Sequence, residues 1–287
     1  MNFLLSALGK IDLFTSYLKG IEKEKGPILV SGLSDVAKVH IVSGTKEYLK
    51  RPICIITYNE IQAKKLINDL KYFEKEILYF PKREIVTYDY VAESKDLPYE
   101  RIETLNKMQE MRTGVVITTI EAVLQKMINK KALYKNTLNF KVGDSENLET
   151  IKQKLVELGY VRCDLIEGRG QFSVRGGIVD ISVNEKEGVR LEFWGDEIDS
   201  IRYFNVVSQR STENIDKITI YPAHEYILES NIEDVITNIR NTIYSEKLQE
   251  TIEQDIELIK AGNYISKIDR YLNSFYTEQD TILDYIT

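Results

Sequence analysis

The stretch that decides the fold of the second half of the chain spans residues 170–195. It reads GQFSVRGGIVDISV, then the turn NEKEG, then VRLEFWG. In both runs apolar residues alternate with polar ones, as Phe172 and Val174 do in the first run and Leu191 and Phe193 in the second. Because successive side chains of a strand point to opposite faces of a sheet, this alternation between turn residues predicts an antiparallel meander with one buried face.

Flanking segments extend this unit. Residues 196–207, DEIDSIRYFNVV, continue the meander, and the acidic GDEIDS that opens them is interpreted as a charged hairpin turn. Residues 147–160, NLETIKQKLVELGY, carry an apolar stripe at helical spacing and reach Gly159, a typical helix stop. The pair Gly176-Gly177 inside the meander indicates a bulge or a close approach of two backbones.

The pattern differs toward the N-terminus. Short apolar runs alternate with helical patterns over residues 1 to about 130, which predicts a parallel sheet covered by helices. The fold class is therefore α/β, followed by one more strand at 218–222 and helices from about Ser230 onward. The predicted strands of the first part are ILV (28–30), ICIIT (53–57), EILYF (76–80) and VVITT (115–119).

Residues 32–39, GLSDVAKV, follow the first of these runs and resemble a phosphate-binding loop. The template G-x-x-x-x-G-K-[ST] is met by Gly32 and Lys38 but not by Ala37 and Val39. Ala37 adds a Cβ where backbone must approach a phosphate, and Val39 cannot ligate magnesium. We expect a loop that keeps the frame of a nucleotide site without its chemistry.

Composition narrows the classes of function. The 287 residues carry a formal net charge of −7, with two cysteines (Cys54 and Cys163) and two histidines (His40 and His224). An acidic chain is a poor non-specific binder of nucleic acid, and so few cysteines and histidines disfavour a metal site or a disulfide framework. No signal peptide or membrane span is visible, so we expect a cytoplasmic protein. The last helical pattern has no stop signal, which is weak evidence for a longer parent protein.

Residues 160–225, from YVRCDLIEGRGQFSVRGGIVDIS through VRLEFWGDEIDSIRYFNVVSQRS to ITIYPAHE, carry a family resemblance. They resemble domain 2 of the excision-repair protein UvrB and, more closely, the UvrB-like module of the bacterial transcription-repair coupling factor family (Mfd). The segment FPKREIVTYDY…ERIETLNKM (80–108) is similar to the same family. The resemblance covers roughly residues 10–230.

This resemblance implies an architecture. Residues 1–130 would form a domain similar to UvrB domain 1, RecA-like with a degenerate P-loop, and residues 131–208 an inserted α+β domain that binds UvrA. Residues 209–287 would return to the first domain, including the strand 218–222. The tyrosine-rich hairpin that UvrB inserts into damaged DNA is missing after YDY (88–90), so Tyr88, Tyr90 and Tyr99 are expected to serve mainly in packing.

The resemblance also implies partners and a site. The module would be non-catalytic and would recruit UvrA to stalled RNA polymerase, with ATP, magnesium, DNA and the polymerase handled by other domains and the C-terminal region of the parent protein masking the site. Arg162 and Arg175 match the arginines of the family that contact UvrA. Phe172, Ser173 and Val179 are their neighbours, and Ser173 replaces a third arginine of UvrB.

Three alternatives stay open at the level of sequence. Arg162 and Arg175 could pair internally with Asp164, Glu192 or Asp180 instead of binding a partner. The chain could be an active P-loop ATPase or helicase fragment, which ATP binding lost in Lys38→Ala would favour. It could be a DNA-binding repair module, which steeply salt-dependent DNA binding would favour.

Overall fold

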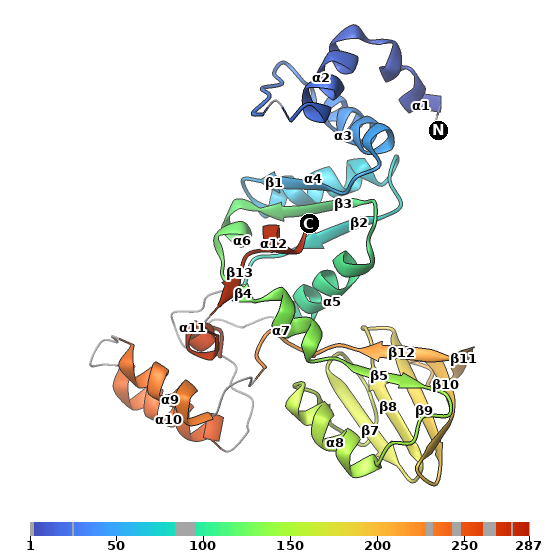
Figure 1. Cartoon of the computed structure of the whole chain (residues 1–287), viewed down its shortest axis with the longest axis vertical. Coiled ribbons are helices and arrows are strands. Elements are labelled where there is room, and N and C mark those ends of the chain that lie inside the picture. Colours follow the sequence, from blue (N-terminus) through green and yellow to red (C-terminus); the bar gives the residue numbers. More distant parts are fainter. Residues whose placement is uncertain are drawn as a thin grey trace. The chain divides into compact units, whose positions relative to one another are not determined.

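The computed structural model divides into two compact units, each described here by itself (Figure 1). Unit 1 comprises Met1–Lys82, Thr104–Gln125 and Tyr285–Thr287, and unit 2 comprises Arg83–Glu103 and Lys126–Asp284. Helix α5 (Leu97–Glu110) contributes to both units. The structure describes residues 3–24, 26–83, 96–227, 232–242, 248–260, 268–276 and 278–286.

Unit 1 contains a parallel three-stranded sheet in the order β1-β3-β2. Its strands are β1 (Ile53–Thr57), β2 (Ile77–Phe80) and β3 (Val115–Thr119), which confirms three of the four predicted strands. The central strand β3 is buried along its whole length. Helices α3 (Asp35–Leu49) and α4 (Glu60–Leu70) supply Val39, Ala63 and Leu70 to the core that also includes Val115 and Ile117.

The predicted strand at 28–30 is wrong. These residues lie outside every strand of the described chain, and Leu29 is 91% exposed. A strand forms only where its backbone groups find partners, and residues 28–30 pair with none of the described strands. The segment before it is helical and consists of α1 (Phe3–Ser6), the 3-10 turn η1 (Leu8–Lys10) and α2 (Asp12–Glu22).

Unit 2 contains a six-stranded sheet in the order β11-β10-β9-β8-β7-β6. All neighbours are antiparallel except β6 and β7, which are parallel. The predicted meander is therefore confirmed. The strands are β6 (Val161–Arg162), β7 (Gln171–Arg175), β8 (Ile178–Ser182), β9 (Glu187–Trp194), β10 (Glu197–Asn205) and β11 (Ser211–Ile215).

The glycine pair forms the turn between β7 and β8. Gly176 has φ of +60°, in the left-handed region that glycine enters without strain. A Cβ on Gly177 would lie 2.9 Å from the carbonyl oxygen of Phe193, so the backbone approach expected there is present. The residues Gly195 and Asp196 separate β9 from β10 and form the predicted hairpin turn of the GDEIDS segment.

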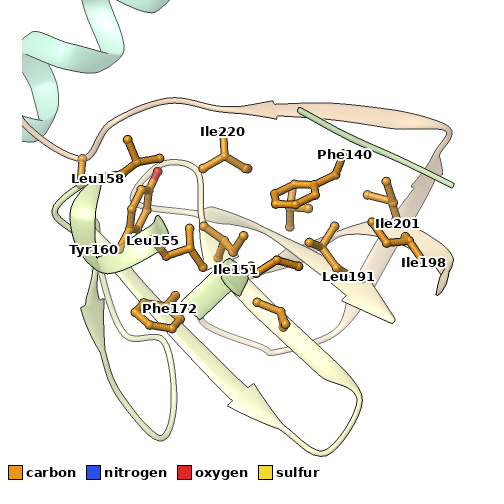
Figure 2. Close-up of a cluster of buried hydrophobic side chains, with 14 residues drawn as sticks. Phe140, Ile151, Leu155, Leu158, Tyr160, Phe172, Leu191, Ile198, Ile201 and Ile220 are labelled. Carbon is orange, nitrogen blue, oxygen red and sulfur yellow. The ribbon is translucent and has the colours of Figure 1, made fainter. Parts of the chain in front are cut away.

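One face of this sheet is covered by helix α8 (Leu148–Glu157) and by the pair β5 (Leu138–Lys141) and β12 (Lys217–Ile220). Figure 2 shows Ile151 and Leu155 of α8, Phe140 and Ile220 pointing toward the side chains of the sheet. We call this the inner face. Because Ile220 lies in its core, strand β12 packs with the antiparallel sheet, whereas the resemblance implied a return to the first domain.

The remaining elements are short strands and helices outside the two larger sheets. Strand β4 pairs with β13 near the end of the chain. The domain boundaries at 130 and 208 stay predictions. No helix among the described residues is long and apolar enough to span a membrane. The remaining helices and strands are α6 (Ile120–Leu124), β4 (Met127–Ile128), α7 (Lys130–Lys135), α9 (Ile232–Asn241), α10 (Gln249–Lys260), η3 (Ile268–Tyr271), α11 (Leu272–Phe275), β13 (Gln279–Asp280) and α12 (Ile282–Tyr285).

Candidate protein-interaction surface

Ser34 of the P-loop-like segment caps helix α3. The Ser34 hydroxyl accepts a hydrogen bond from the Ala37 amide at 3.3 Å, so a side chain uses one of the free N–H groups of the first turn. Lys38 and Lys65 both bind the Asp35 carboxylate, at 3.1 and 2.6 Å. These hydrogen bonds, that of Lys65 first, lower the pKa of Asp35. The Lys38 ammonium, which would bind a phosphate in a nucleotide site, is therefore paired with the Asp35 carboxylate in this structure.

Val39 is the second departure from a nucleotide site. Its side chain is 1% exposed and belongs to the core of unit 1. The position that supplies a magnesium-binding hydroxyl in a P-loop thus points into apolar packing. Gly32 has φ of +74° and keeps the turn that precedes the helix. The backbone frame of the loop is present. Of the two template positions that contact phosphate and magnesium, Lys38 forms a salt bridge and Val39 packs in the core.

The face of this sheet opposite to the inner face carries polar side chains, several of which are buried, and we call it the outer face. Cross-strand pairing places Ser173 opposite Asp180, Asp180 opposite Arg190, and Arg190 opposite Arg202. These four residues form one row across β7, β8, β9 and β10. Since their chain neighbours point to the inner face, the whole row follows from the two-residue period of a strand.

Asp180 is the centre of this row. Its side chain is 2% exposed and accepts hydrogen bonds from both Arg175 and Arg190. Arg190 binds it through Nε at 2.7 Å and through Nη2 at 3.0 Å, whereas Arg175 binds it through Nη2 alone at 2.8 Å. Bidentate arginine–carboxylate pairs are the stronger and more fixed kind. Arg190 is therefore the resident partner of Asp180.

The two arginines differ in exposure. The side chain of Arg190 is 16% exposed, and its guanidinium lies 5.1 Å from the centroid of the Phe204 ring. The side chain of Arg175 is 50% exposed. If Arg175 turned toward a partner, Asp180 would stay paired with Arg190 and no buried charge would be left alone. Internal pairing, the alternative raised for Arg175, is present in the structure but does not hold this residue firmly.

A second charged group lies on the same face. Ile178 pairs with Arg175 on one side and with Glu192 on the other. Glu192 accepts hydrogen bonds from Arg202 and, at 3.0 Å, from the Ser200 hydroxyl. These contacts fix the side chains of Glu192 on β9 and Arg202 on β10 at the outer face.

Arg162 lies on the short edge strand β6 and is exposed. Among the described residues, no hydrogen bond or ion pair holds its guanidinium, so the internal pairing considered from the sequence does not occur for Arg162 there. It is free to meet a partner.

The other three predicted contact residues are buried. Phe172 and Val179 are 0% exposed and belong to the core of the inner face, and Ser173 is 1% exposed. The Ser173 hydroxyl donates to the carbonyl oxygen of Asp164 at 3.1 Å and so supports the β6–β7 segment. In this structure these side chains position the strands, and a partner cannot reach them.

The tyrosines proposed as packing residues are only partly described. Tyr88 and Tyr90 lie outside the described residues. Tyr99 packs against the inner core, and a Cβ on Gly170 would lie 2.2 Å from its ring. Burial raises the pKa of Tyr99. Tyr99 is therefore used for packing, as expected.

Sequence reasoning named Asp180 as a possible internal partner of Arg175 but missed its bond with Arg190 and the role of Arg202. Their signal was available, because Asp180, Arg190 and Arg202 all occupy polar positions of the alternating runs. What the alternation did not give was the register between strands, which decides that Asp180 lies opposite Arg190.

The fold therefore combines an α/β unit that carries a P-loop-like segment with a unit built on a six-stranded, mostly antiparallel sheet. Residues 138–226, which include β5, the six-stranded sheet and β12, match the family model described as UvrB interaction domain.

Over 99% of its length the chain is 28% identical to the transcription-repair-coupling factor of Bacillus subtilis (strain 168). Over 90% of its length it is 32% identical to that of Staphylococcus aureus (strain bovine RF122 / ET3-1) and, over a similar share, 31% identical to that of Staphylococcus haemolyticus (strain JCSC1435). It covers 26%, 23% and 23% of these relatives, so the chain spans about a quarter of their length. The resemblance to the transcription-repair coupling factor family is confirmed: the chain contains a UvrB interaction domain and is homologous to part of these factors.

Proposed function

We propose that this chain is a non-catalytic docking module that recruits UvrA in transcription-coupled nucleotide excision repair. In this proposal unit 1 is a degenerate UvrB domain 1-like body, and the sheet of unit 2 carries the binding site. RNA polymerase and DNA are contacted by other domains of the parent protein, and its C-terminal region masks the docking surface. The observation that carries the proposal is the half-exposed Arg175, whose internal partner Asp180 is held independently by Arg190.

The energetics favour such an arginine. Moving Arg175 from Asp180 to a carboxylate of a partner exchanges one charge-assisted hydrogen bond for another, and Asp180 keeps its bidentate pair. A planar guanidinium that reaches a partner carboxylate in a partly desolvated interface contributes about 1.5–3 kcal/mol. Arg162 has no internal bond among the described residues to give up, so its contribution is limited mainly by the ordering of its side chain.

The first test concerns this arginine. Arg175→Ala is expected to weaken binding of the 287-residue chain to UvrA at least tenfold, about 1.4 kcal/mol, because a charged hydrogen bond across the interface is lost. Isothermal titration calorimetry with purified UvrA measures the affinity, and a thermal melt of the variant checks that the fold is intact.

Arg240→Ala is the matched control for this test. Arg240 is also half exposed, at 49%, and also pairs with a carboxylate, Glu253 at 2.8 Å, but it lies on helix α9. Its loss is expected to leave the affinity for UvrA unchanged. Equal affinities of wild type and Arg175→Ala would remove Arg175 from the site, and steeply salt-dependent binding of DNA by the wild type would favour the DNA-binding alternative.

The second test concerns nucleotide. We expect no measurable binding of ATP with magnesium at micromolar concentration. The Lys38 ammonium is paired with the Asp35 carboxylate, and the Val39 side chain lies in the core. Asp35→Asn with Val39→Thr is the informative variant, because it removes the competing carboxylate and restores the hydroxyl. A fluorescence anisotropy titration with fluorescent ATP measures the nucleotide affinity of the wild type and of this double variant. Tight binding by the wild type that is lost in Lys38→Ala would support the ATPase alternative instead.

A further inference from the structure

Trp194 is the only tryptophan of the chain and is 84% exposed. It is the last residue of β9, directly before the two-residue turn to β10. A large aromatic side chain that is left in water at a strand end contributes little to folding, because its apolar area is not buried. The position therefore calls for a reason outside the stability of the unit.

The register places Trp194 on the outer face. Arg190 and Glu192 precede it by four and two residues on the same strand, and both carry their side chains on that face. Its cross-strand partner is Glu197 of β10. On the other side, the Phe193 amide donates to the Gly177 carbonyl at 2.8 Å, so the end of β9 lies against the β7–β8 turn.

Arg175 directly precedes that turn. It shares a cross-strand row with Ile178 and Glu192, and Trp194 is the next outward position of β9 beyond Glu192. The Trp194 indole and the Arg175 guanidinium thus lie at the same end of the outer face. Both stand on paired strands, so little conformational freedom is lost when a partner binds them.

We propose, on the basis of the proposed function, that Trp194 is the aromatic anchor of the docking surface. It inserts into an apolar slot of UvrA whose rim carries carboxylates for the exposed arginines. Charge complementarity supports this occupant: Arg175 and Arg202 of this face are 50% and 34% exposed, whereas Asp180 and Glu192 are 2% and 26% exposed. In both ion pairs the arginine is therefore more accessible than its carboxylate, and the exposed Glu197 lies on the other side, opposite Trp194. Tryptophan and arginine together are the residue types most enriched at binding hot spots.

The test compares two substitutions of this side chain in the 287-residue protein. Trp194→Ala is expected to weaken binding to UvrA at least tenfold, and Trp194→Phe to retain most of the affinity because an aromatic ring still fills the slot. Val207→Ala is the matched control, since Val207 is 88% exposed in the turn after β10 and its loss is expected to change nothing.

A spectroscopic measurement locates the contact directly. Incorporation of 5-fluorotryptophan gives a single fluorine resonance from Trp194, whose H₂O–D₂O isotope shift reports exposure to solvent. We expect this isotope shift to disappear when unlabelled UvrA is added. If Arg175→Ala weakens binding while Trp194→Ala does not and the isotope shift persists, Trp194 is not an anchor of the interface. The proposed docking function would then be unaffected. If the wild type does not bind UvrA, both fail.

Discussion

Arg101→Met is expected to lower the free energy of unfolding of unit 2 by about 3–5 kcal/mol, since it removes one partner of a buried ion pair. Arg101 lies on helix α5 and its Nε donates to Glu225, which follows strand β12. The two side chains are 0% and 2% exposed. Without the guanidinium, a carboxylate stays in the interior without its main compensating charge.

The pKa of Glu225 explains why the loss is large. Burial alone would raise the pKa of this carboxyl, but the charges of Arg101 and Arg83 hold it below its usual value. Removal of Arg101 leaves burial as the dominant influence and raises the pKa. The destabilisation of Arg101→Met is therefore expected to shrink as the pH falls and Glu225 becomes neutral.

Two variants separate the buried charge from general packing damage. The double variant Arg101→Met with Glu225→Leu removes both charges and is expected to recover most of the lost stability. Arg240→Met breaks the exposed pair with Glu253 and is expected to change stability little, because solvent screens that pair. Urea unfolding followed by hydrogen exchange of the β7–β9 amides reports unit 2. A single variant as stable as wild type at pH 7 would contradict the prediction.

This ion pair also bears on the docking surface. The first turns of α5 contact the segment between β6 and β7, because Arg169 of that segment lies 3.4 Å from Glu100 and 3.5 Å from Glu103. Tyr99 of the same helix packs over Gly170. By holding α5 in place, the pair of Arg101 with Glu225 supports the strands that carry Arg162 and Arg175.

Much of the fold follows from local patterns. The alternation of Phe172 and Val174, and of Leu191 and Phe193, gave the meander because a strand with one buried face must repeat every two residues. The strands at 53–57 and 115–119 followed from short β-branched runs between helical patterns. Both signals depend on neighbours in sequence, and this is why they can be read without a structure.

The features that the sequence did not give depend on pairing between distant segments. Nothing in ILV at 28–30 distinguishes it from ICIIT at 53–57 except that only the second finds a neighbouring strand. Arg101 and Glu225 are separated by 124 residues, and no local pattern in the sequence indicates that their side chains pair. The burial of Phe172 and Val179 could be read from alternation, but the family motif alone placed them among contact residues.

In the proposed function, the two faces of the sheet of unit 2 have different roles. The inner face carries the apolar core that holds α8 and β12, so substitutions there are expected to act through folding. The outer face carries a charged row whose buried members, Asp180 and Arg190, keep each other paired. This arrangement leaves Arg175 and Trp194 available for binding without a cost to the fold.

Unit 2 is expected to lose about 2–3 kcal/mol of stability between pH 7 and pH 4 through His224. Burial lowers the pKa of His224 to about 4, and the imidazole packs against Gly159, where a Cβ would lie 2.1 Å from Nε2. The unfolded state takes up a proton near the ordinary histidine pKa of 6.5, whereas the folded state does so only near 4. The stability from the neutral ring is therefore complete above pH 6.5 and is lost as the pH falls through this window.

His224→Gln isolates this contribution, because glutamine keeps a hydrogen-bond acceptor for the Tyr226 amide, which donates to His224 Nδ1 at 3.3 Å, but does not titrate. The slope of unfolding free energy against pH between 4 and 6.5, measured by hydrogen exchange of the β7–β9 amides, should become shallower in this variant. His40→Gln, in helix α3 of unit 1, should leave the slope for unit 2 unchanged. Glu225, whose pKa is also lowered, contributes in the same direction but only below its ordinary value of 4.5. A slope in His224→Gln as steep as in the wild type would assign the acid sensitivity to carboxylates alone.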